Sequence, residues 1–163
     1  MNKKKEAVLS HIDEHEKASM VDVHEKNITK RIAIASSKVF LNDTSYKLLK
    51  KNKSKKGDIL NTARIAGIMA SKKTSELIPL CHQLNLENVD ISYIFHDSEN
   101  LIIVKSTSIA SDKTGVEMEA LVATTIASLT IYDMLKAVDK KIKISDIWLD
   151  YKDGGRSGKF VRD

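Results

Sequence analysis

Residues 89–109 read VDISYIFHDSENLIIVKSTSI. Apolar and polar residues alternate in the first half of this segment, which predicts a half-buried β-strand. Residues 97–100 (DSEN) form a polar turn, and the apolar residues 101–109 predict the second strand of a hairpin. The segment therefore predicts two neighbouring antiparallel strands.

One further strand is predicted on each side of this hairpin, at residues 29–41 and 142–151. With helices between them, the order is strand, helices, strand, strand, helix, strand, which is the βαββαβ arrangement of ferredoxin-like folds. We expect an α+β fold, a ferredoxin-like sandwich whose antiparallel sheet has helices on one face. The strands carry apolar residues on both faces, so we expect oligomerisation to bury the second face.

Three helices are predicted from caps and periodicity. Asn42 or Asp43 could cap a short helix, and Asp58 caps a longer one that runs to about Lys73. The longest helix covers residues 115–138, where apolar residues recur at three- and four-residue steps. The face predicted from these steps consists of Met118, Leu121, Val122, Thr125, Leu129 and Tyr132.

Length and composition indicate one globular domain, because 163 residues with 42% hydrophobic and 30% charged side chains can build a single core. We expect residues 1–19 to be a flexible extension and residues 20–163 to be the domain, ending in a mobile glycine-rich segment. Apolar runs are far shorter than the ~20 residues that cross a bilayer, so no membrane association is expected. The single cysteine, Cys81, fits a reducing compartment, and we expect a cytoplasmic protein.

The net charge of +5 comes from clustered lysines, six of which lie between residues 47 and 56. A second basic cluster covers the last part of the chain, from Lys136 onward. Two interpretations fit: a solvated surface, or a partner that is anionic, such as a nucleic acid, a nucleotide or phosphate.

The start of the longest helix and one pair further along it are candidates for chemistry. Thr114 and Glu117 have the spacing of a capping box, whereas Glu117 and Glu119 could instead bind the polar edge of a base. Asp133 and Lys136 form either an exposed ion pair, contributing about 0.2–0.5 kcal/mol, or an acid–base pair. A proton-donating lysine would need its pKa lowered by burial or by neighbouring cations.

Cys81 and His82 are adjacent on an extended segment, so they point to opposite sides and do not form a catalytic dyad. His82 could donate or accept a hydrogen bond with a ligand. The other histidines have no zinc-binding spacing, and we expect no metal site. The basic segment Lys56-Gly57-Asp58 precedes a helix and could bind phosphate, as could the glycine-rich segment at residues 154–158.

Several motifs, in order and in register, resemble the cyclic pyranopterin monophosphate synthase family of molybdenum-cofactor biosynthesis. The resemblance covers roughly residues 20–160. The motifs are MVDV (20–23), KGD (56–58), TARIAG (62–67), LIPLCH (77–82), KTGVEMEAL (113–121), LTIYDMLKAV (129–138) and GGRSG (154–158). Departures are Gln83 for a usual proline, Ser75 for a common aromatic residue and Arg156 for a frequent lysine.

The resemblance implies a lyase that converts a GTP-derived, ring-closed dihydroguanosine triphosphate into a cyclic pyranopterin phosphate and releases pyrophosphate. It implies no cofactor, and a homohexamer, a trimer of dimers, with sites between subunits. The residues matching the family's catalytic positions are Asp133, Lys136 and Lys56. The residues matching its substrate-binding positions are Leu80, Cys81, His82, Glu117, Met118, Glu119 and the basic Lys26, Arg31 and Lys152.

Two other classes of protein were weighed against this resemblance. An RNA-binding module would share the order of elements and the basic clusters, but such sheets present aromatic residues for base stacking, and only 5% of this chain is aromatic. A scaffold without activity would be expected to have lost a catalytic residue, whereas Asp133, Lys136, Lys56 and His82 are all present. The sequence therefore favours the enzyme, and no nucleic-acid partner is expected.

Overall fold

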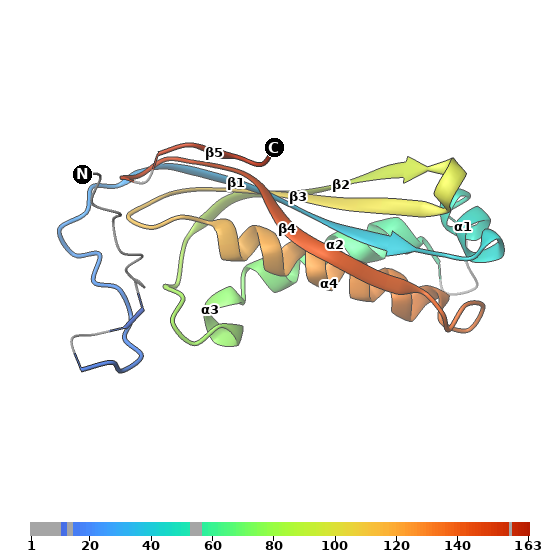
Figure 1. Ribbon diagram of the computed structural model, residues 1–163, viewed down its shortest axis with the longest axis horizontal. Coiled ribbons are helices and arrows are strands. Elements are labelled where there is room, and N and C mark those ends of the chain that lie inside the picture. The colour runs from blue at the N-terminus through green and yellow to red at the C-terminus, as the bar shows by residue number, and fades with distance from the viewer. Residues whose placement is uncertain (1–10, 13–14, 53–56, 157) are drawn as a thin grey trace, which may run out of the picture.

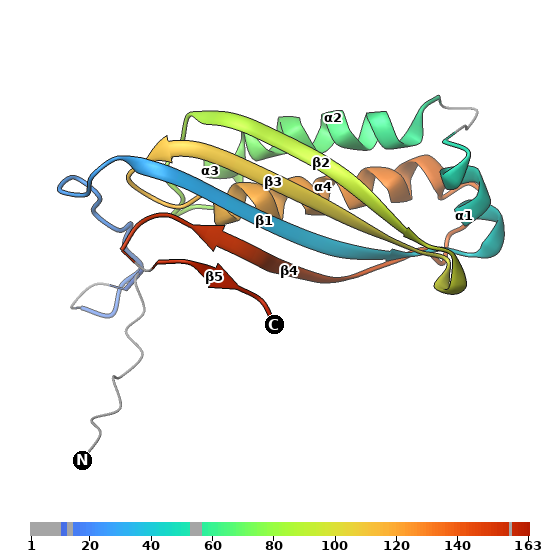
Figure 2. The same ribbon diagram turned by 90° about the horizontal axis from the view of Figure 1, so that it is seen from above.

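The computed structural model describes residues 11–12, 15–52, 57–156 and 158–163. A five-stranded antiparallel sheet forms one layer, and the helices cover one of its faces (Figures 1 and 2). The strand order is β2-β3-β1-β4-β5. The strands are β1 (Thr29–Phe40), β2 (Leu86–His96), β3 (Leu101–Asp112), β4 (Lys143–Asp153) and β5 (Phe160–Val161).

The helical layer consists mainly of α2 and α4, which pack side by side against the sheet (Figure 2). A 3-10 turn, η1 (Asp97–Glu99), closes the hairpin between β2 and β3. The α+β class and the helices on one face are confirmed, and the ferredoxin-like assignment within this class stays a prediction. The helices are α1 (Asp43–Lys50), α2 (Ile59–Ser71), α3 (Thr74–Leu77) and α4 (Glu117–Leu135).

The first two helices begin at the predicted caps. The Asn42 side chain accepts a hydrogen bond from the backbone N–H of Ser45 at 2.8 Å, and Asp58 accepts one from Asn61 at 2.8 Å. Each bond satisfies a backbone donor that has no partner within the helix. These local signals therefore fixed the start of α1 and of α2.

The buried face of α4 is a different face from the predicted one. Its buried residues are mostly small, and the predicted face remains partly exposed, with Leu129 50% exposed. Apolar residues lie on all sides of α4, so periodicity alone could not identify the inward face. Small residues occupy the inward face because α2 lies very close: a Cβ on Gly67 would lie 2.7 Å from the Ala123 carbonyl oxygen. The buried residues are Glu119, Ala120, Ala123, Thr124, Ala127, Ser128, Ile131 and Leu135.

By length and composition alone, α4 could also cross a membrane. Its buried residues pack instead on the sheet and on α2, as expected for the central helix of a folded core. Hydroxyl groups join it to β1: Ser37 Oγ lies 3.1 Å from Thr124 Oγ1 and 2.7 Å from Ser128 Oγ. These directional contacts add to apolar packing and fix where α4 sits on the sheet.

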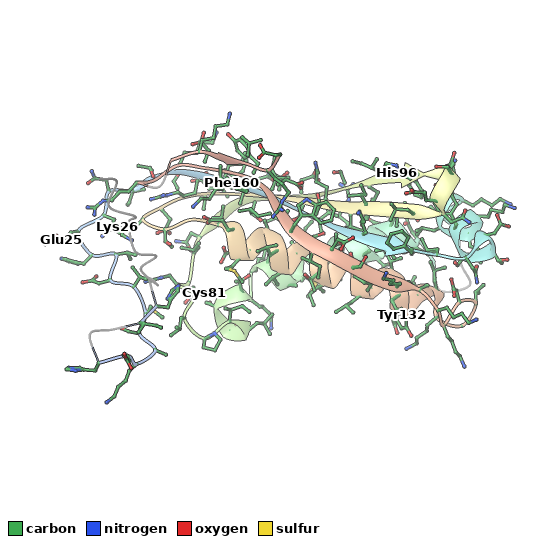
Figure 3. All side chains as sticks on the ribbon, viewed as in Figure 1. Glu25, Lys26, Cys81, His96, Tyr132 and Phe160 are labelled. Atoms are coloured by element: carbon green, nitrogen blue, oxygen red, sulfur yellow. The ribbon has the colours of Figure 1, made fainter. Side chains whose placement is uncertain are left out.

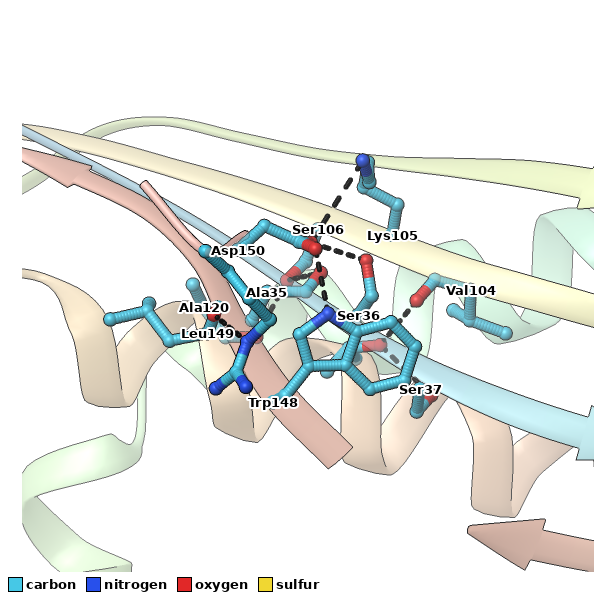
Figure 4. Close-up of polar contacts among 12 residues, drawn as sticks. Ala35, Ser36, Ser37, Val104, Lys105, Ser106, Ala120, Trp148, Leu149 and Asp150 are labelled. Atoms are coloured by element: carbon cyan, nitrogen blue, oxygen red, sulfur yellow. Dashed lines mark hydrogen bonds and ion pairs between the residues drawn. The ribbon is translucent and has the colours of Figure 1, made fainter. Parts of the chain in front are cut away.

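Among the residues that the structure describes, no helix covers the other face of the sheet (Figure 1). Because side chains alternate along a strand, Ile32 and Ile34 point to this face while Ser37 points to α4. The Asp150 carboxylate accepts hydrogen bonds there from Ser36 Oγ and, at 2.7 Å, from Trp148 Nε1 (Figure 4). The open face around Ile32 and Ile34 thus combines apolar side chains with a hydrogen-bonded polar cluster.

Candidate functional site

The first cavity, of about 370 Å³, lies at the N-terminal end of α4. The segment between α3 and β2 contributes Leu80, Cys81 and His82, and the first turn of α4 faces it. Residues about 40 positions apart in the chain therefore line one cavity. Sequence periodicity describes only near neighbours and could not predict that they would meet. The residues from α4 are Glu117, Met118 and Glu119.

A second cavity, of about 600 Å³, adjoins the first through four shared lining residues. Its basic residues include Lys26, Arg31 and Lys152, which come from the N-terminal segment, β1 and β4. All nine residues predicted to bind substrate therefore line one of these two adjoining cavities. The shared residues are Lys26, Thr114, Gly115 and Glu117.

Arg31 is only 7% exposed, and its guanidinium supports the loop before α4. Nε donates to the Asp112 carbonyl and Nη2 to the Lys113 carbonyl, each at 3.0 Å. Gly155 lies directly on this guanidinium at φ +84°, so a Cβ there would collide with Nη1. Arg31 therefore joins the loop at residues 112–113 to the glycine-rich segment and lines the cavity as a rigid cation.

The predicted capping box is wrong. The N-cap of α4 is Val116, which has no side-chain hydrogen bond, and Thr114 lies two residues before it. Glu117 pairs instead with Lys152, whose Nζ lies 2.9 Å from Glu117 Oε1. Both side chains are 26% exposed. Glu117, which lines both cavities, thus forms an ion pair with a lysine that lines the second cavity.

Glu119 is a carboxyl group in an unfavourable environment. It is 4% exposed, and burial, with smaller contributions from the charges of Glu117 and Asp112, raises its pKa to about 7. Burial also raises the pKa of the Cys81 thiol, and the charge of Glu119 adds to this effect. Near neutral pH, Glu119 can therefore either donate or accept a proton, the property that a general acid or base requires.

Asp133 and Lys136 lie at the other end of α4. Their side chains form an ion pair of 2.6 Å and are each more than half exposed. The hydrogen bond to Asp133 raises the pKa of Lys136, the opposite of the lowering that proton donation needs. Fourteen residues of helix separate Glu119 from Asp133, about 21 Å at 1.5 Å per residue. Figure 3 accordingly places Cys81 and Tyr132 far apart along the helical layer.

Lys56 lies outside the described residues. The next two residues, Gly57 and Asp58, immediately precede α2. The first residue of α2, Ile59, belongs to the same core cluster as Leu135 at the end of α4. Figure 2 shows the start of α2 and the end of α4 at the same end of the molecule, so Gly57 and Asp58 lie at the Asp133–Lys136 end.

Several residues that line these cavities were not predicted to bind substrate from the sequence. His11 and Val21 line the first cavity and Lys113 lines the second. No periodic pattern marks the N-terminal residues, whereas Lys113 immediately precedes the Thr114-Gly115 motif and could have been proposed. Within the described ranges, no group of three or more His, Cys, Asp and Glu side chains is arranged to hold a metal ion.

Comparison with known proteins matches residues 20–155 to the model of the MoaC family. A Campylobacter jejuni (strain RM1221) protein named cyclic pyranopterin monophosphate synthase is 50% identical over 154 residues, covering 94% of this chain and 98% of the relative. Proteins of the same name from Staphylococcus aureus (strain bovine RF122 / ET3-1) and Brevibacillus brevis are 47% and 46% identical, each covering 94% of this chain and 96% of the relative. The chain belongs to the MoaC family.

Proposed function

We propose that this chain is a lyase with cyclic pyranopterin monophosphate synthase activity, acting in molybdenum-cofactor biosynthesis. Its substrate is a GTP-derived, ring-closed dihydroguanosine triphosphate, which it converts to the cyclic pyranopterin phosphate with release of pyrophosphate. One observation carries the proposal: a basic cavity and an acid-containing cavity adjoin, and their lining comes from the motifs that resemble the family.

The two cavities suit the two halves of this substrate. The basic cavity can hold the triphosphate through Lys26, Lys152 and Arg31, and the guanidinium of Arg31 is already held in place by its own hydrogen bonds. The smaller cavity then receives the base and sugar, where Glu119 and His82 can bind polar ring atoms. Met118 and Leu80 supply apolar contact with the rings.

Asp133, Lys136 and Lys56 act as the catalytic residues from a neighbouring subunit. About 21 Å of helix separates Asp133 from Glu119, so one chain does not bring all the groups to one substrate. Docking against a second chain would bury the exposed Lys136 beside other cations, and both effects lower a lysine pKa. The complete site then lies between two chains of a homohexamer, a trimer of dimers.

Large apolar side chains on the molecular surface support this assembly. Leu129 on α4 and Ile94 on β2 are 50% and 44% exposed, and they belong to opposite layers of the fold. A hexamer has enough distinct interfaces to cover both layers. We place the enzyme in the cytoplasm and expect it to need neither a cofactor nor nucleic acid.

A direct assay tests the activity. The purified chain is incubated with the cyclised GTP derivative, and pterin product and pyrophosphate are measured together. We expect both in equal amounts. Tight RNA binding with a steep salt dependence, and no turnover of the nucleotide, would favour the binding-module interpretation instead.

Subunit mixing tests the shared site. Glu119→Gln and Lys136→Ala each inactivate a different half of the site, so each variant alone should be nearly inactive. Unfolding the two together and refolding them should restore a measurable fraction of activity, because some interfaces then carry two intact halves. An active monomer in light scattering, or mixtures that stay inactive, would refute a site between subunits.

A further inference from the structure

The N-terminal segment lies along both cavities. We call its described residues, 11–12 and 15–28, the N-terminal strap. His11 and Val21 line the smaller cavity, Glu25 lines the basic one, and Lys26 lines both. In Figure 1 this segment forms the end of the molecule beside α3 and the start of α4. The strap is therefore a wall of the site.

Specific contacts hold the strap in this position. The Ser19 N–H donates to the His11 carbonyl at 3.0 Å, and Ile12 bridges Ala18 in antiparallel fashion, so the strap starts with a small hairpin. Further along, Lys113 Nζ donates to the His24 carbonyl at 2.7 Å. The loop before α4, which Arg31 supports, thus also anchors the strap.

We propose that His11 is a further substrate-binding residue, contacting the base portion of the nucleotide opposite the first turn of α4. This inference rests on the proposed function, since the triphosphate in the basic cavity leaves the smaller cavity for the base. Imidazole supplies one donor and one acceptor in its neutral form, which suits the polar edge of a fused-ring base. Val21 adds an apolar wall beside it.

The test compares His11→Ala with His11→Gln and with His15→Ala in the full-length chain. One hydrogen bond contributes about 0.5–1.5 kcal/mol net, so His11→Ala should raise KM about 3- to 10-fold with kcat little changed. His11→Gln keeps a donor and an acceptor and should recover most of the affinity. His15 lies in the same hairpin and is not among the residues lining the two cavities, so His15→Ala should behave as wild type.

Calorimetry with two probes separates the base from the phosphates. His11→Ala should weaken binding of GTP and leave binding of inorganic tripolyphosphate unchanged, whereas Lys152→Ala should weaken both. An unchanged affinity of His11→Ala for GTP would overturn the proposal, as would equal losses for the two probes. Should the wild type bind GTP and yet form no pterin product, the proposed function fails while the role of His11 is still measured.

Discussion

The N-terminal end of α4 opens into two cavities lined by charged groups, whereas its C-terminal end carries an ion pair on the surface. At the first end, burial raises the pKa of the Glu119 carboxyl group to about 7, and hydrogen bonds hold the Arg31 guanidinium in place. At the second end, the side chains of Asp133 and Lys136 are each more than half exposed, and the hydrogen bond between them raises the pKa of Lys136. In a single chain, the residues predicted to bind substrate therefore line cavities, whereas Asp133 and Lys136, which are predicted to be catalytic, lie on the surface.

The largest effect, a loss of turnover, is expected at the C-terminal end of α4. Lys136→Arg keeps the positive charge, but a guanidinium does not give up its proton. If Lys136 transfers a proton in the assembled enzyme, turnover should fall about 10²–10⁴-fold while the hexamer and nucleotide binding persist. Lys140→Arg, at an exposed lysine in the loop that follows α4, is the matched control. Substantial activity in Lys136→Arg would show that this residue supplies charge alone.

A smaller effect is expected at the N-terminal end of α4, where Glu119 should make stability depend on pH. Glu119 has a folded-state pKa of about 7 against an ordinary 4.5, so the folded chain holds its proton more tightly than the unfolded chain. The free energy of unfolding should therefore fall as pH rises from 4.5 to about 7, by at most about 3 kcal/mol, and be flat above that.

Denaturant titrations at pH 5 and pH 8 measure this difference. Glu119→Gln has no proton to lose and should abolish most of the slope. Glu76→Gln, at an exposed acid on α3, should keep it. A wild type whose stability rises over this range would contradict the assigned pKa.

The smallest effect concerns how the helices begin. Asp58→Ala removes an observed cap from α2 and should cost about 1 kcal/mol of stability. Thr114→Ala removes no cap from α4 and should cost less than about 0.5 kcal/mol, as for an ordinary surface substitution. Unfolding curves of the two variants measured side by side check this order, and equal losses would restore the capping box.

The sequence predicted what depends on neighbouring residues. The β2–β3 hairpin, and the caps at Asn42 and Asp58, follow from short patterns and were confirmed. The inward face of α4 was not predictable because apolar residues lie on all sides of that helix, and β5, with two residues, is too short to show a pattern.

The cavities could not be predicted from local sequence patterns, for a different reason. Arg31 and Lys152 are more than a hundred residues apart in the chain, and pairing of β1 with β4 brings them to one cavity. Only the resemblance to a family placed them in one site. Within the strap only Lys26 was predicted to bind substrate, and only through the resemblance, because the strap residues have mixed charge and no periodicity. The position of the strap depends on contacts such as that of Lys113 with the His24 carbonyl.

The hydroxyl contacts of Ser37 with Thr124 and Ser128 have a consequence for the length of α4. They fix the axial position of the helix at a point midway between its N-terminal and C-terminal ends. One residue inserted between Ser128 and Asp133 would rotate everything beyond it by about 100° and advance it by about 1.5 Å. The carboxylate of Asp133 and the ammonium of Lys136 would then face a different neighbour, although every side chain of the site was still present. The length of α4 between these hydroxyl contacts and Asp133 is therefore expected to matter as much as the identity of its side chains.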